Sequence, residues 1–198
     1  ELGKLTKSSP YGSVDTPFNP LSLALGAEAT FVARTIDSDR AHLTEVLTAA
    51  AAHRGTSLVE IYQNCPIFND DAFSTLKGPE GLLIKLVHGE PITFGAGEFA
   101  VVRGADGDIS IAKTSEIDES SIVVHDETRE DPSLAFALAR LTEPGILRQA
   151  PVGIFRRVER PSYDDLVRDQ IASLQPEDSE AALAAVLAGP DTWEADER

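Results

Sequence analysis

The sequence feature that most constrains the fold is a strand, a helix and a second strand in close succession. Residues 29–36 (ATFVARTI) contain β-branched and aromatic side chains without a helix breaker, which predicts a strand. Four apolar residues then recur at the spacing of one helix face: Leu43, Val46, Leu47 and Ala50. The helix can be capped by Asp37 or Ser38 and is expected to end at Gly55. Residues 56–62 (TSLVEIY) are the next predicted strand, so the unit predicts two parallel strands joined by a crossover helix.

Shorter elements are expected on both sides of this unit. A turn of helix is predicted over residues 21–26 (LSLALG), which end in a glycine. A second helix is expected to begin at Asp131 and Pro132. Its predicted buried stripe consists of Leu134, Ala137, Leu138 and Leu141. The remaining strand candidates are residues 82–87, 99–103, 109–113, 121–124 and 152–158. Residues 104–107 (GADG) are expected to join two of them as a hairpin turn.

These patterns predict an α/β fold with three regions. Residues 1–64 contain the strand–helix–strand unit, residues 65–158 form a smaller α+β region, and residues 159–198 form a helical tail. The tail holds 11 acidic and 3 basic residues, so it carries −8 of the net charge of −16. Helical spacing in the tail covers residues 163–174 and 180–187. We expect the tail to be an arm that packs on a neighbour, or a partly mobile end.

The excess of acidic over basic residues disfavours two classes of binding partner. With 33 acidic and 17 basic residues, the chain repels phosphate backbones and anionic lipids, so we expect no nucleic-acid or membrane partner. No apolar run approaches the length of about 18 residues that a membrane span needs, and the first ten residues hold no apolar leader. A cytoplasmic location is therefore expected. The chain has no Met and begins with Glu1, so we expect it to be part of a longer polypeptide.

Cys65 is the residue that stands out chemically. As the single cysteine, it excludes a disulfide framework and a self-contained cysteine metal site. It follows the predicted strand 56–62 at the rim where α/β sheets bind ligands, with Asn64 and Asn69 as polar neighbours. From the residues alone, an inert buried thiol is the more common interpretation, and a functional thiol is the alternative.

The other candidate residues favour structural roles. His42, His53, His88 and His125 are scattered without the spacing of a helical metal site, so we expect them to be exposed or hydrogen-bonded. By the helix phase, the first two lie on its solvent side. Asp106-Gly107-Asp108 could offer oxygen ligands to a cation, but a hairpin turn explains it better. Gly95-Ala96-Gly97 has no following helix and is expected to be a turn.

Several stretches in order along the chain resemble a known family. They are KSSPYG at 7–12, DTPFNP at 15–20, LALGA at 23–27, FVAR at 31–34 and VEIYQNCPIFN at 59–69. Together they closely resemble the β subunit of 2-oxoacid:ferredoxin oxidoreductases, most closely the 2-oxoglutarate type. HGEPI at 88–92, IVVHD at 122–126 and DTW at 191–193 are also similar. The resemblance spans essentially the whole chain, and the run around Cys65 is its most specific part.

The resemblance implies a fold and an activity. Residues 1–64 would be the C-terminal half of a thiamine diphosphate-binding domain, a parallel sheet with flanking helices, and residues 65–158 the C-terminal region of the β subunit. The implied reaction is oxidative decarboxylation of a 2-oxoacid to acyl-CoA and CO2. Electrons would pass through a [4Fe–4S] cluster to ferredoxin, with coenzyme A as acyl acceptor and an α subunit as partner. The implied cofactors are the cluster, thiamine diphosphate and Mg²⁺.

By this resemblance Cys65 matches the fourth ligand of the cluster, and Asn69 matches a family position without an assigned role. The other three cluster cysteines and the Gly-Asp-Gly diphosphate motif correspond to sequence that this chain lacks. We therefore expect the N-terminal part of the β subunit as a further partner. No catalytic residue is predicted within these 198 residues.

Two alternatives stay open beside the oxidoreductase. One is an acidic α/β protein-binding module in which Cys65 is structural and no cofactor binds. The other is part of a thiamine enzyme without redox chemistry, in which Cys65 binds no cluster. Bound iron separates the oxidoreductase from both alternatives, whereas the choice among 2-oxoacids depends on residues mostly outside this chain.

Overall fold

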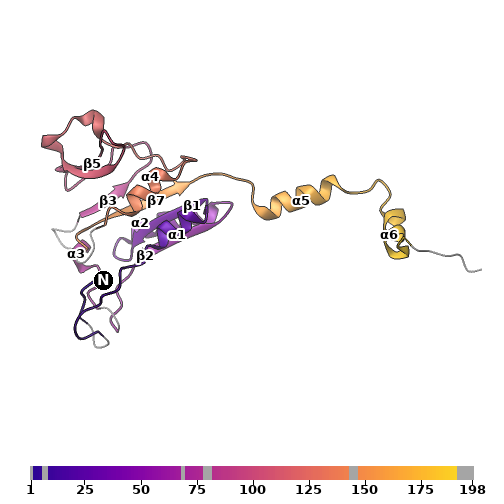
Figure 1. The fold of residues 1–198 in the computed structure, drawn as a ribbon, viewed down its shortest axis with the longest axis horizontal. Coiled ribbons are helices and arrows are strands. Elements are labelled where there is room, and N and C mark those ends of the chain that lie inside the picture. The colour runs from indigo at the N-terminus through magenta and orange to yellow at the C-terminus, as the bar shows by residue number, and fades with distance from the viewer. Residues whose placement is uncertain (1, 6–8, 68–69, 78–81, 143–146, 191–198) are drawn as a thin grey trace, which may run out of the picture. The chain divides into compact units, whose positions relative to one another are not determined.

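The structure is a computed structural model that describes residues 2–5, 9–67, 70–77, 82–142 and 147–190 (Figure 1). The chain divides into two compact units, Glu1–Arg160 and Pro161–Arg198. The first unit contains all the strands among the described residues, and the described part of the second contains two helices.

The first unit is built on a four-stranded sheet with the order β2-β1-β7-β3. The strands are β1 (Phe31–Ile36), β2 (Ser57–Tyr62), β3 (Leu82–Leu86) and β7 (Gln149–Arg157). β1 and β2 are parallel, which confirms the predicted strand–helix–strand unit. β7 is parallel to β3 but antiparallel to β1, so the sheet as a whole is mixed. The α/β class is confirmed, and strands from both sides of residue 65 share this sheet.

Helix α2 (Arg40–Ala52) connects β1 to β2 and covers one face of the sheet. Its cap is Asp39, whose carboxylate accepts from the His42 backbone N–H. The predicted caps, Asp37 and Ser38, lie before the cap position, and the Asp37 carboxylate instead contacts the segment after β2. Val46 packs into the core, whereas Leu47 of the predicted apolar stripe is 43% exposed.

Two short helices lie on the other face of the sheet. They are α1 (Pro20–Gly26) and α4 (Ser133–Ala139), and their leucines pack with Val32 and Phe155 in the main core. Asn19 joins them, because its Oδ1 accepts from the Ser22 N–H and its Nδ2 donates to the Ala139 carbonyl. In α4 the buried alanines are Ala135 and Ala139, whereas Ala137 of the predicted stripe is half-buried.

A small antiparallel sheet follows β3. Its strands are β4 (Thr93–Phe94), β5 (Phe99–Arg103) and β6 (Ile109–Lys113). β5 and β6 pair across the GADG turn, which confirms the predicted hairpin. The strand predicted over residues 121–124 is wrong. Asp118 caps a short 3-10 turn, η2 (Glu119–Ser121), and the following residues make isolated bridges from Ile122 to Val102 and from Val124 to Pro91. The other short helices are η1 (Thr114–Glu116) and α3 (Ser74–Lys77).

The second unit contains α5 (Tyr163–Ser173) and α6 (Ser179–Ala188), close to the predicted segments. Ser162 caps α5 through the Asp165 N–H, and Asp178 caps α6. Neither helix contains a buried residue. Among the described residues of the whole chain, no helix has the length and apolar character needed to cross a membrane.

Gly153 lies on β7 opposite Leu86, the last residue of β3. Its φ is +127°, and a Cβ added there would stand 2.7 Å from the Leu86 carbonyl oxygen. A side chain at this position therefore meets both an unfavourable backbone conformation and a backbone atom that cannot move aside.

We predict that Gly153→Ala lowers the free energy of unfolding by about 2–4 kcal/mol, because strain and overpacking add. Gly107→Ala is the matched control. Gly107 also has a positive φ, of +91°, but its Cβ would meet nothing within 4 Å. That substitution is expected to cost only about 1 kcal/mol. Urea denaturation of both variants checks the difference, and equal losses would contradict the close approach.

His125 is a polar group enclosed in the core. It is 0% exposed, and its Nε2 lies 2.7 Å from the Ile154 carbonyl oxygen on β7. Its Nδ1 is buried and has no hydrogen-bond partner among the described residues. Burial lowers the pKa of His125, so the neutral ring is the form that the fold accommodates.

We predict that acidification destabilises the first unit through His125. The unfolded chain takes up a proton as the pH falls below about 6.5, whereas the folded chain does so only at lower pH. The neutral ring therefore makes its whole contribution to the free energy of unfolding above that pH. Below it, this contribution falls by up to about 1.4 kcal/mol per pH unit. His125→Gln should flatten this decline in denaturation curves between about pH 6.5 and 5. The unaltered chain, measured over the same pH range, provides the comparison.

Candidate functional site

Cys65 lies three residues past the end of β2 and is half-buried. This is the carboxyl end of the parallel pair formed by β1 and β2, where open α/β sheets place their ligands. Within the described parts of the chain, no three His, Cys, Asp or Glu side chains gather closely enough to hold a metal ion. The donor set therefore fits one corner of a four-thiolate cluster and not a complete site.

The segment that carries Cys65 is held from the neighbouring strand end. The Asp37 N–H donates to the Tyr62 carbonyl oxygen at 3.0 Å, which continues the β1–β2 pairing by one residue. The Asp37 side chain then accepts from the Asn64 N–H through Oδ2 at 2.9 Å. Its other oxygen, Oδ1, lies 2.7 Å from the Lys77 ammonium, which lowers the pKa of Asp37. The carboxylate is therefore charged at neutral pH and bridges two segments.

Asn64 extends this network beyond Cys65. Its Nδ2 donates to Asp70 Oδ1 at 3.1 Å, and the Asp71 N–H donates to the same oxygen. The Asn64 Oδ1 is buried, and among the described residues this acceptor has no hydrogen-bond donor. Asn69, which the family resemblance also indicates, lies outside the described residues.

A buried arginine on β1 contacts β2 near its carboxyl end. Arg34 on β1 is 2% exposed, and its Nε lies 2.6 Å from Glu60 Oε2 on β2. Its guanidinium also lies over the rings of Tyr62 and Phe155, at 5.0 and 5.5 Å from their centroids. Burial raises the pKa of Tyr62 to about 12, so this phenol stays neutral. Sequence reasoning missed Arg34, although a charged residue inside a largely apolar strand was the available signal.

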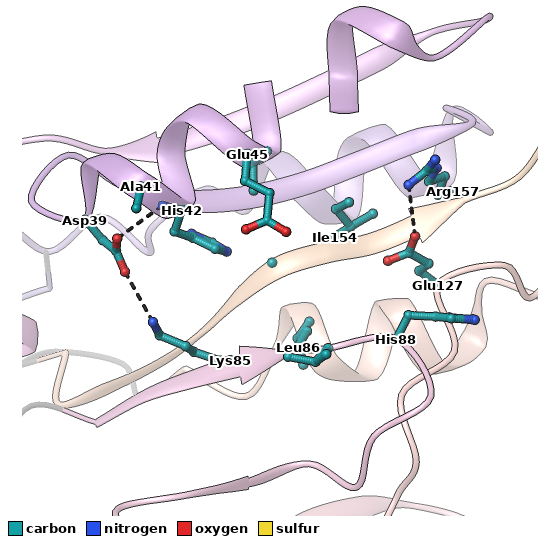
Figure 2. A pocket seen from close by; sticks show the side chains of 13 residues that line it. Asp39, Ala41, His42, Glu45, Lys85, Leu86, His88, Glu127, Ile154 and Arg157 are labelled. Carbon is teal, nitrogen blue, oxygen red and sulfur yellow. Dashed lines mark hydrogen bonds and ion pairs between the residues drawn. The ribbon is translucent and has the colours of Figure 1, made fainter. Parts of the chain in front are cut away.

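A groove of about 510 Å³ lies between α2, β3 and β7 (Figure 2). An ion pair stands at each end, Asp39 with Lys85 and Glu127 with Arg157. Burial raises the pKa of Glu127, whose side chain is 13% exposed. Sequence reasoning did not identify this groove, because its lining comes from α2, β3, β7 and the segment at Glu127, which are separated in the chain. Its charged walls are largely paired with each other.

The histidines make local contacts and form no metal group in the described structure. The prediction that His42 and His53 face solvent is wrong, because both are half-buried. His42 Nδ1 lies 2.8 Å from Thr35 Oγ1, and His53 Nε2 lies 2.8 Å from Thr30 Oγ1. Burial lowers the pKa of both rings. His88 is exposed, with its Nδ1 3.6 Å from Asp126 Oδ1.

Two sequence candidates for ligand loops are turns in the structure. Asp106 Oδ1 accepts from the Asp108 N–H inside the β5–β6 hairpin, as expected. Gly95 and Gly97 both have positive φ in the connection between β4 and β5, where a turn was predicted.

Comparison with known proteins points to one kind of enzyme subunit. No protein-family model matches the chain. The 2-oxoglutarate oxidoreductase subunit KorB of Mycobacterium tuberculosis is 53% identical over 201 aligned residues, which cover 99% of this chain and 53% of the relative. The 2-oxoacid:ferredoxin oxidoreductase subunit beta of Saccharolobus solfataricus is 39% identical over 70 residues, or 35% of this chain and 23% of the relative.

A solved structure shares the fold. It is the 2-oxoglutarate:ferredoxin oxidoreductase from Magnetococcus marinus with 2-oxoglutarate, coenzyme A and succinyl-CoA bound. The TM-score is 0.60 at 23% sequence identity, over 96% of this chain and 50% of the other. This chain spans about half the length of the mycobacterial relative. The resemblance inferred from the sequence is confirmed: the match to the mycobacterial 2-oxoglutarate oxidoreductase subunit covers 99% of this chain, and shorter matches are to beta subunits of 2-oxoacid:ferredoxin oxidoreductases.

Proposed function

We propose that this chain is part of the β subunit of a 2-oxoglutarate:ferredoxin oxidoreductase. In this role it takes part in the oxidative decarboxylation of a 2-oxoacid to acyl-CoA and CO2. Its 53% identity to the mycobacterial subunit across almost its whole length supports the assignment. The proposed substrate is 2-oxoglutarate, because the mycobacterial relative that matches 99% of this chain is named as a 2-oxoglutarate oxidoreductase subunit.

Within that enzyme, Cys65 supplies one thiolate to a [4Fe–4S] cluster. The observation that carries this proposal is the position of the chain's single cysteine, half-buried at the carboxyl end of β2 in a tethered segment. A cluster of this type is held by four thiolates, so three come from another part of the assembly. Thiamine diphosphate with Mg²⁺, when bound, supplies the carbon nucleophile for decarboxylation, and the cluster supplies a one-electron relay.

The proposal implies several partners. They are the remaining length of the β subunit, an α subunit, ferredoxin, coenzyme A and the 2-oxoacid. Residues outside this chain hold most of the thiamine diphosphate site. The chain's own contribution is to fix the strand ends through Arg34 and Glu60 and to present Cys65 beyond them. We place the complex in the cytoplasm.

We predict that Cys65→Ala reduces bound iron and sulfide in the anaerobically purified complex to less than about half, because the cluster loses one of four thiolates. The visible absorption band should weaken in parallel. Ser57→Ala, at the opposite end of β2, is the matched control and should leave iron content unchanged. Iron and sulfide assays of the three complexes make the measurement.

Two outcomes would overturn the proposal at different levels. A fully loaded cluster in the Cys65→Ala complex would remove Cys65 from the ligand set. A colourless complex without iron, even with all partner chains present, would remove the redox function. The acidic protein-binding module would then be the better account of the chain.

A further inference from the structure

The carboxylate of Asp37 occupies a specific place between three segments of the chain. It follows β1, it accepts from the backbone of the segment after β2, and it pairs with Lys77 at the end of α3. We propose that Asp37 is a positioning residue for Cys65, which sets where the thiol stands before the remaining cluster ligands arrive. This inference rests on the proposed role of Cys65 as a cluster ligand.

The first step of the argument is the backbone geometry. In the parallel pairing, Ile36 is the partner of Tyr62, so Asp37 is the first residue beyond the paired strands. Its own N–H holds the Tyr62 carbonyl, and its Oδ2 holds the Asn64 N–H. The backbone is thus fixed at two positions within the three residues that precede Cys65. The second contact requires a side-chain oxygen at position 37.

The second step is the orientation of that carboxylate. The Lys77 ammonium lies 2.7 Å from Oδ1, and the two side chains are 29% and 28% exposed, so water screens the pair only in part. An ion pair on one oxygen restricts rotation of the carboxylate and leaves the other oxygen directed at the Asn64 N–H. Lys77 therefore acts on the Cys65 segment through Asp37.

The third step is that the segment is also held on its far side. The Asn64 side chain donates to Asp70, which accepts from the Asp71 N–H as well. The chain around Cys65 is therefore anchored before and after the thiol. A ligand held in place before binding loses less conformational freedom when the cluster forms. Partners that orient metal ligands in this way typically contribute ~10–100-fold to metal affinity.

Asp39 provides a matched comparison two residues further along. It is also an aspartate at the junction of β1 and α2, it caps a backbone N–H, and it pairs with a lysine at 3.2 Å. Its carboxylate accepts from the His42 N–H of α2 and from the Lys85 ammonium of β3. Removing Asp39 thus removes a similar cap and ion pair at the same strand end without touching the Cys65 segment.

The test uses the anaerobically purified complex with Asp37→Ala, Asp37→Asn, Asp39→Ala or Cys65→Ala. For each complex we would measure bound iron and the electron paramagnetic resonance spectrum of the reduced cluster. We expect Asp37→Ala to bind iron at least about tenfold more weakly in competition with a chelator and to alter the spectrum. Asp37→Asn should restore both in part, because its amide oxygen can still accept from the Asn64 N–H, although the ion pair with Lys77 is lost. Asp39→Ala should match the unaltered complex.

Three results would overturn the inference. These are unchanged iron affinity and spectrum in Asp37→Ala, equal losses in Asp37→Ala and Asp39→Ala, or no rescue by Asp37→Asn. The Cys65→Ala complex distinguishes a failure of the positioning role of Asp37 from a failure of the proposed function. If it loses iron while Asp37→Ala does not, only the positioning role is lost. If it keeps a full cluster, the ligand role of Cys65 is lost and the positioning role with it.

Discussion

The structure depends on the register of the parallel strands β1 and β2, which pairs Phe31 with Ser57 and Ile36 with Tyr62. This register places Arg34 beside Glu60 and brings Asp37 to the backbone of Asn64. A one-residue slip would turn every side chain of β2 to the opposite face and separate both pairs. The candidate site is therefore a consequence of the pairing and not a separate element added to the sheet.

Buried charge makes this register costly to change. Arg34 is almost completely enclosed, and its contacts with Glu60 and two aromatic rings offset the loss of water around the guanidinium. Arg156 on β7 is buried to a similar degree and pairs with Glu28, while its Nη2 donates to the Glu130 carbonyl. Ion pairs of a buried arginine add little net stability, but an alternative pairing would leave the buried guanidinium uncompensated. We infer that they favour one arrangement of the sheet over others.

Local sequence patterns predicted most of the helices and strands, but they predicted the pairing of distant strands only in part. The strand–helix–strand unit, the β5–β6 hairpin and both tail helices follow from residues within a few positions of one another. β7 pairs antiparallel with β1, which brings together residues more than 100 positions apart. No local sequence pattern predicts the direction of such a distant pairing. The false strand at residues 121–124 has the same origin. Its apolar side chains are suited to a strand, but the Asp118 cap and its partners on two other segments decide its backbone.

The sequence by itself determined the class of the fold, the family resemblance and the candidate thiol, because a single cysteine within a specific run of residues is a one-dimensional signal. Only the tertiary structure decided what surrounds Cys65. Asp37, Lys77 and Arg34 are 12 to 31 positions away from it in the chain, and they are relevant because adjacent strand ends bring them close to its segment. Hydrogen bonds act over about 3 Å, so their partners are set by packing and register rather than by order in the sequence.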